Sequence, residues 1–192
     1  MGNIILASAS DRRIELLNHI GAKFKVQPSN IDESAVSLRG SPGEKVEKLS
    51  LMKAVDVADN NDKSLIIGAD TIVLIDGEIL GKPKDKEDAF RMLSLLSGRA
   101  HFVITGVAVL DSSSGAYRVG HEITKVFFSN LEPEKIRAYI DTGEPEGKAG
   151  AYAIQGIGAL LVEKIEGCYF NVVGLPLFKV SRMLEEFGEK LL

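Results

Sequence analysis

The most apolar stretch of the chain, Leu65–Ile75, sets the first constraint on the fold. It is rich in β-branched residues, and such a run is typical of a strand that is buried inside a sheet. The dipeptide Asp76-Gly77 follows directly and predicts a hairpin turn that returns through Glu78–Leu80. A hairpin on the central strand excludes an all-parallel sheet.

Strand-like and helix-like segments alternate along the rest of the chain, and no linker, repeat or low-complexity tract separates them. Strands are predicted over residues 3–8, 24–27, 65–75, 78–80, 100–110, 116–128 and 160–165. Helices are predicted over residues 11–20, 43–58, 133–141 and 175–187 and between Asp85 and Gly98. We therefore expect an α/β fold with a mixed, curved sheet flanked by helices, built as one domain over residues 1–192 without a linear boundary.

Composition limits the partners that the chain can have. A net charge of −4 and a pI near 5.5 argue against a broad nucleic-acid-binding face, although a local basic cluster can still attract a small anion. The single cysteine, Cys168, excludes an internal disulfide, as expected for a reducing compartment. No segment is apolar enough for long enough to span a bilayer, and the N-terminus lacks a secretion signal. We expect a cytoplasmic protein with neither a nucleic acid nor a membrane as partner.

The four residues Gly68-Ala69-Asp70-Thr71 interrupt the apolar strand. A carboxylate in the middle of a buried strand is costly unless it is paired, hydrogen-bonded or bound to a cation. Asp70 is therefore the first candidate for a catalytic carboxylate. The alternative is an aspartate at the end of a strand, tied into a turn with Thr71.

A second candidate site lies at residues 8–13, where the first strand passes into the first helix. Ser10 suits the N-cap position, and the free N–H groups of a helix N-terminus attract anions. Arg12 and Arg13 oppose the helix dipole there, at a cost of about 0.3–1 kcal/mol each when exposed. An anionic ligand would offset this cost, because guanidinium groups bind phosphate oxygens well. The alternative is a pair of solvated arginines with acidic neighbours.

Four further polar residues are candidates. Lys53 lies on the inner face of the second helix, where its amine either serves a ligand or reaches past the core to water. Lys82 lies in a loop shaped by Gly81 and Pro83, which could present its amine to a ligand. Glu33 lies in a polar loop, where it either binds a metal or keeps the loop solvated. In the glycine-rich passage 143–158, Gln155 has the donor and acceptor needed to bind a base edge.

Taken together, these segments resemble the Maf family, the septum formation proteins that are nucleoside triphosphate pyrophosphatases. The matching blocks occur in order over nearly the whole chain. They are SASDRRIELL, DES, the helix that contains Lys53, GADT, GEILGKP, LSGRAHFVITGV, TKVFF, GEPEGKAGAYAIQG and NVVGLPL.

The resemblance implies an ITPase-like α/β structure with a central cleft between two lobes, usually as a homodimer. It also implies hydrolysis of a nucleoside triphosphate to the monophosphate and pyrophosphate, with Mg²⁺ or Mn²⁺ as cofactor. The family's proton acceptor matches Asp70, and its acidic position after the second strand matches Glu33, so these two are the expected metal ligands. The substrate-binding positions match Ser8, Arg13, Lys53 and Lys82.

Three positions mark base preference in this family, and they are Arg12, Thr71 and Gln155 here. This set resembles the branch that hydrolyses dTTP and UTP. The alternatives are a pyrophosphatase for 7-methyl-GTP or another modified nucleotide, and a non-catalytic nucleotide sensor linked to cell division. One departure is Asp11, which stands where the family usually has proline; aspartate also suits a helix N-terminus.

Overall fold

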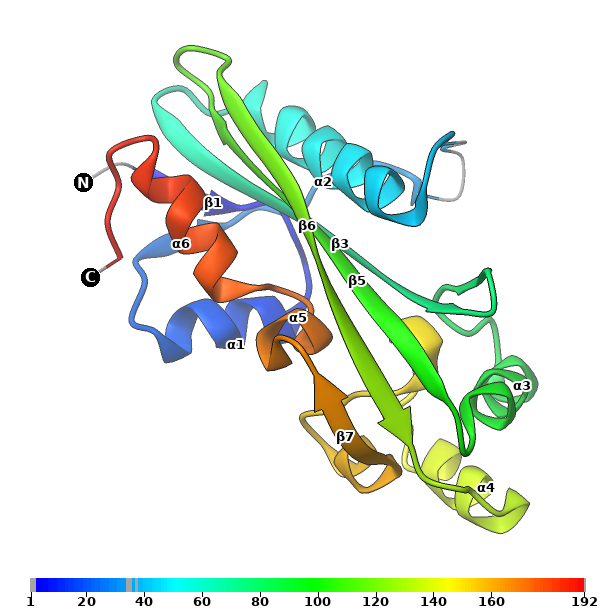
Figure 1. Cartoon of the computed structure of the whole chain (residues 1–192). Helices are drawn as coiled ribbons and strands as arrows, with labels where there is room; N and C mark the ends of the chain where they lie inside the picture. Colours follow the sequence, from blue (N-terminus) through cyan, green and yellow to red (C-terminus); the bar gives the residue numbers. More distant parts are fainter. Residues whose placement is uncertain (1–2, 34–35, 37, 192) are drawn as a thin grey trace. The chain divides into compact units, whose positions relative to one another are not determined.

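The structure is a computed structural model, and it describes residues 3–33, 36 and 38–191 (Figure 1). Within these residues, seven strands form one mixed sheet in the order β2-β1-β3-β5-β6-β7, with β4 paired to β3. The strands are β1 (Asn3–Leu6), β2 (Phe24–Val26), β3 (Ser64–Ile75), β4 (Glu78–Leu80), β5 (Ala100–Asp111), β6 (Tyr117–Phe128) and β7 (Val162–Glu166). The helices are α1 (Asp11–His19), α2 (Pro42–Ala58), α3 (Lys86–Leu96), α4 (Pro133–Asp141), α5 (Tyr169–Val173) and α6 (Leu177–Glu185), with short 3₁₀ helices η2 (Ala149–Ala151) and η3 (Ile157–Leu161).

The chain divides into two compact units, and neither is a continuous segment. The first comprises Met1–Asp70, Thr105–Glu122 and Gly174–Leu192, and the second comprises Thr71–Ile104 and Ile123–Val173. The division crosses β3, β5 and β6, so each of these long strands belongs to both units. Because the boundary falls inside continuous strands, nothing in the composition of the sequence marks it.

In the first unit, β1 runs parallel to both β2 and the first part of β3. Ile66 and Ile67 point to opposite faces of β3, and both are fully buried, so helices must cover the sheet on both sides. On one face, Ala54 and Val57 of α2 share a core cluster with Ile66. A capping box fixes the start of α2: the Ser41 side chain accepts from the Glu44 backbone, and the Glu44 carboxylate accepts from the Ser41 backbone.

In the second unit, β4 pairs antiparallel with the last part of β3 through a tight turn. Asp76 and Gly77 both have positive φ, at 48° and 84°, which is the conformation that an Asp-Gly hairpin turn requires. Strand β7 pairs antiparallel with β6. Leu93 and Leu96 of α3 are fully buried in the core of this unit.

The predicted mixed α/β sheet flanked by helices is confirmed, and α4 has the predicted bounds. One helix was missed, and two predicted element starts were wrong. Short α5 was not predicted, the residues before Val162 form η3 instead of the start of a strand, and the last helix begins at Leu177. Ser10 is at the N-cap of α1, but its side chain makes no capping hydrogen bond. The single domain, the curvature of the sheet and the central cleft stay predictions.

None of the helices in the described part of the chain is long and apolar enough to cross a membrane.

Candidate active site

A buried ion pair joins α2 to the central strand. Lys53 Nζ donates to Asp70 Oδ1 at 2.9 Å and to the Ala69 carbonyl at 3.4 Å. Lys53 is 5% exposed and Asp70 is 8% exposed, so water screens this pair only weakly. The Lys53 amine does not reach past the core to water, so the alternative for Lys53 is wrong. The alternative of an aspartate at a strand end is also wrong, because β3 continues past Asp70 to Ile75.

Two glycines allow α2 to lie directly on the sheet. A Cβ at Gly68 of β3 would meet the Ser50 carbonyl oxygen at 2.0 Å, and a Cβ at Gly106 of β5 would meet the Val46 carbonyl oxygen at 2.3 Å. Gly68 and Asp70 point to the same face of β3, because side chains alternate along a strand. Lys53 follows Ser50 by one turn of α2, and it therefore reaches Asp70 where Asp70 emerges under the helix.

Glu33 reaches the same lysine from the loop after β2. Its Oε1 lies 2.8 Å from Lys53 Nζ, and its side chain is 40% exposed. Lys53 thus contacts one oxygen from each of two carboxylates, Glu33 and Asp70. Ser34, the last residue of the DES block, lies outside the described residues.

Arg13 is buried at the start of α1, which excludes the solvated alternative for this residue. Its Nε donates to the Gly174 carbonyl at 2.8 Å, and its NH1 donates to Ser8 Oγ at 3.1 Å. Burial lowers the pKa of the guanidinium to about 10; the Asp70 carboxylate opposes this shift, Arg12 adds to it and Glu33 opposes it. Arg13 therefore carries its charge at neutral pH, within the electrostatic reach of both carboxylates.

The cluster formed by Arg13, Glu33, Lys53 and Asp70 pairs two cations with two carboxylates. Across the described residues, no group of three or more His, Cys, Asp or Glu side chains is arranged to hold a metal ion. Two carboxylates are nevertheless the protein ligands that Mg²⁺ usually takes when substrate phosphates and water complete its shell. The donor set of Glu33 and Asp70 therefore fits a cation that arrives with a nucleotide.

The remaining predicted residues are Arg12, Thr71, Lys82 and Gln155. Arg12 is partly buried in the first turn of α1, in the first unit. Thr71, Lys82 and Gln155 belong to the second unit: Thr71 is in β3, Lys82 is exposed in the loop after β4, and Gln155 is exposed in the turn before η3. The described contacts thus bring together the residues predicted for catalysis, the metal and part of the phosphate site, all within the first unit.

Sequence reasoning missed the backbone groups that complete the site. The Ala69 and Gly174 carbonyls accept from Lys53 and Arg13, and Gly68 supplies the space for α2. The only sequence signal for these positions was their place in the GADT and NVVGLPL blocks. Gly174 is 161 residues from Arg13, so no local pattern predicts that contact.

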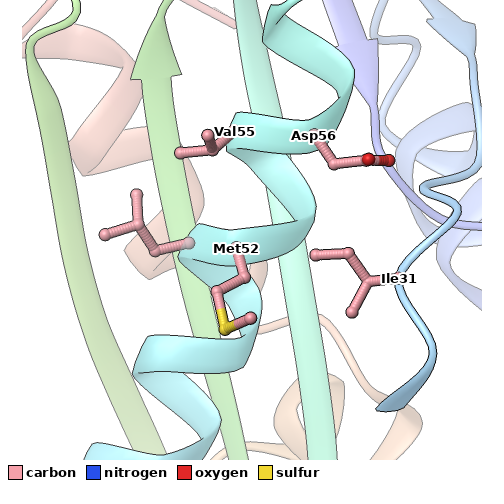
Figure 2. Close-up of a pocket in the computed structure, with 5 residues that line it drawn as sticks. Ile31, Met52, Val55 and Asp56 are labelled. Atoms are coloured by element: carbon pink, nitrogen blue, oxygen red, sulfur yellow. The ribbon is translucent and has the colours of Figure 1, made fainter. Parts of the chain in front are cut away.

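A separate apolar hollow of about 360 Å³ lies on α2. Figure 2 shows Met52, Val55 and Asp56 projecting from the helix, with Ile31 approaching from a neighbouring segment. Leu51 completes the lining. None of the predicted site residues lines this hollow, and its surface offers almost no polar group to a phosphate.

Comparison with known proteins gives one matching family and several similar proteins. A family model described as Maf-like protein matches residues 3–187. A dTTP/UTP pyrophosphatase of Ruminiclostridium cellulolyticum is 54% identical over 192 residues, which is 100% of both chains. A dTTP/UTP pyrophosphatase of Moorella thermoacetica is 53% identical over 188 residues, 98% of this chain and 96% of that protein. The structure of a HAM1 protein from Coxiella burnetii is a looser likeness, with a TM-score of 0.47 and 16% identity over 68% of this chain and 75% of that one.

Proposed function

Because the chain belongs to the Maf family, we propose that it is a nucleoside triphosphate pyrophosphatase that hydrolyses dTTP and UTP to the monophosphate and pyrophosphate. The observation that carries this proposal is the contact of the buried Lys53 amine with both Asp70 and Glu33. Buried ionisable groups that share a partner are typical of catalytic sites. The names of the full-length relatives support the choice of substrate.

In the proposed reaction, water attacks the α-phosphorus, and the bond to the oxygen bridging the α- and β-phosphates breaks. Pyrophosphate leaves with that oxygen, and Asp70 takes a proton from the attacking water. Lys53 holds Asp70 Oδ1 at 2.9 Å and so fixes the orientation of the carboxylate. Fixed orientation and charge neutralisation are the main contributions that proteins make to phosphate transfer.

We assign the binding of the triphosphate to Arg13, Lys53 and Lys82, with Ser8 as a positioning residue. The Gly174 carbonyl and Ser8 Oγ hold two nitrogens of Arg13, so its guanidinium is fixed before a nucleotide arrives. A fixed guanidinium loses little entropy when it binds a phosphate. Lys82 is exposed in its loop and is proposed to contact the phosphates that leave.

A divalent cation, Mg²⁺ or Mn²⁺, is proposed as cofactor, held by Glu33 and Asp70. When bound, it neutralises charge on the phosphate oxygens. The charge of the cluster supports the need for a metal cation. Two carboxylates already match the charges of Arg13 and Lys53, and a triphosphate adds further negative charge. Removal of the cation with a chelator should abolish turnover, and re-addition of Mg²⁺ or Mn²⁺ should restore it.

Arg12, Thr71 and Gln155 are proposed to set the preference for thymine and uracil. The Gln155 amide can donate to O4 and accept from N3–H of these bases. We further propose that the enzyme acts as a homodimer in the cytoplasm. Size-exclusion chromatography with light scattering tests the dimer, which should elute at about twice the chain mass of 20.7 kDa.

Release of pyrophosphate from dTTP, UTP, CTP, dATP, GTP and 7-methyl-GTP, each with Mg²⁺ and with Mn²⁺, tests the proposed function. Selective turnover of dTTP and UTP is the expected result. Turnover of 7-methyl-GTP instead would keep the reaction and overturn the base preference. Binding of nucleotides without turnover of any would identify a nucleotide sensor.

A further inference from the structure

The Glu144 carboxylate holds the backbone that follows Gln155. Its Oε2 accepts from the Ile157 N–H at 2.8 Å, and its Oε1 accepts from the Gly158 N–H at 2.8 Å. Burial raises the pKa of Glu144, but the hydrogen bonds from Gly158, Tyr139 and Ile157 and the charge of Lys148 outweigh it, so the pKa falls below its ordinary value. The carboxylate is therefore a stable acceptor at neutral pH.

Tyr139 holds the backbone that precedes Gln155. Its hydroxyl donates to Glu144 Oε1 at 2.8 Å and accepts from the Ala153 N–H at 3.1 Å. The ring itself is 3% exposed in α4, so the hydroxyl has little freedom to move. One connected set of hydrogen bonds thus holds the backbone on both sides of Gln155. All residues of this set belong to the second unit.

Two glycines show how closely this set surrounds the turn. A Cβ at Gly156 would meet Glu144 Oε2 at 2.1 Å. A Cβ at Gly158 would meet the Ala153 carbonyl oxygen at 2.5 Å and the Tyr139 hydroxyl at 2.7 Å. Larger residues at either position would break these contacts, so the glycines after Gln155 have a packing reason.

We propose that Glu144 and Tyr139 are positioning residues for base selection, because they fix the turn that presents Gln155. This inference rests on the proposed role of Gln155. An amide can rotate to offer its donor and acceptor in either order, and cytosine presents the reverse of the pattern shown by thymine and uracil. The turn does not set the order of donor and acceptor, but it sets where the amide lies against the base edge. Displacing the amide weakens its pairing with O4 and N3–H, on which discrimination against cytosine depends.

The experiment compares kcat/KM for dTTP with kcat/KM for CTP on the same enzyme preparation, for the wild type and for Tyr139→Phe, Glu144→Gln and Gln155→Ala. The ratio is independent of the fraction of folded enzyme, so a loss of stability alone does not move it. Tyr139→Phe keeps the buried ring and removes only the hydroxyl. We expect each variant to lower the dTTP/CTP ratio by about tenfold, on the scale of a lost polar contact that selects a substrate.

A double-mutant cycle separates this proposal from the proposed function. If Glu144 acts through Gln155, Glu144→Gln should change the ratio less than about twofold in the Gln155→Ala background. Glu146→Gln is the matched control, since it makes the same change at an exposed residue of the same loop, and it should leave the ratio unchanged.

The outcomes are distinct. If Gln155→Ala lowers the ratio but Tyr139→Phe and Glu144→Gln do not, the positioning role is wrong while the role of Gln155 stands. The positioning role would also be wrong if Glu144→Gln changed the dTTP/CTP ratio equally in the wild-type and the Gln155→Ala backgrounds. If Gln155→Ala itself leaves the ratio unchanged, the base-selecting role of Gln155 fails, and the inference fails with it.

Discussion

Replacement of Gly68 by alanine should disable the enzyme without touching a catalytic group. The new Cβ would lie 2.0 Å from the Ser50 carbonyl oxygen, 3.0 Å from the Ser50 carbonyl carbon and 3.1 Å from the Ala54 nitrogen. All three atoms belong to the backbone of α2, so no side-chain rotamer relieves the contact. Helix and strand must separate by roughly 1 Å before the contact becomes tolerable, since packed interiors do not absorb such an overlap.

That separation acts directly on the ion pair of Lys53 and Asp70. Lys53 moves with α2, whereas Asp70 moves with β3 two residues after Gly68. An increase of about 1 Å takes the distance of 2.9 Å between Nζ and Oδ1 beyond hydrogen-bonding range. A misplacement of about 1 Å can reduce turnover by about 100-fold, and we expect kcat to fall on that scale. The same overpacking should lower the free energy of unfolding by about 1–3 kcal/mol.

The assay is steady-state pyrophosphate release from dTTP, at a temperature well below the unfolding midpoint of each variant. Gly120→Ala is the matched control, since it also adds a methyl group to a strand of the first unit. There the new Cβ meets the flexible end of Met183 at 3.1 Å, which can move away. A folded Gly68→Ala enzyme with the kcat of Gly120→Ala would refute the reasoning that the glycine contact positions Lys53.

Three other predictions concern stability and binding. Burial lowers the pKa of His101 from 6.5 to about 4, so the unfolded chain binds the proton more tightly than the folded chain. The free energy of unfolding should therefore fall by up to roughly 3 kcal/mol as the pH drops from 6.5 to about 4. Urea unfolding of His101→Phe should show a flatter pH dependence than that of the wild type. Arg13→Lys cannot reach Ser8 and Gly174 together, and the KM for dTTP should rise about tenfold; an unchanged KM would contradict its assignment. Asp85→Ala removes the cap of α3 and should cost about 1 kcal/mol in denaturant unfolding, with no loss of kcat.

Elements with strong local patterns could be predicted from the sequence. The Asp76-Gly77 turn, the central strand and the inner face of α2 follow from residue type and period, and the structure has each of them. Asp70 could be singled out for the same reason, because one carboxylate in an apolar strand is conspicuous. The resemblance then added roles that local patterns do not carry.

Long-range contacts could not be predicted from the residues alone. Glu33 lies in a loop without hydrophobic period, so nothing local indicates that it reaches Lys53. The contact between Arg13 and the Gly174 carbonyl depends on the path of the whole chain. Gly68 was visible only as part of the GADT block; its function depends on the approach of α2, which is a property of packing.

The central claim is that Asp70, held by Lys53, activates the water that attacks the nucleotide. The most direct test is the kcat of Asp70→Asn with dTTP and Mg²⁺, because asparagine keeps the size of the side chain and removes its ability to accept the proton. Asp62→Asn, at an exposed loop residue, makes the same chemical change as a control. We predict a loss of at least ~100-fold for Asp70→Asn alone. A folded Asp70→Asn enzyme that turns over dTTP as fast as Asp62→Asn would contradict the claim.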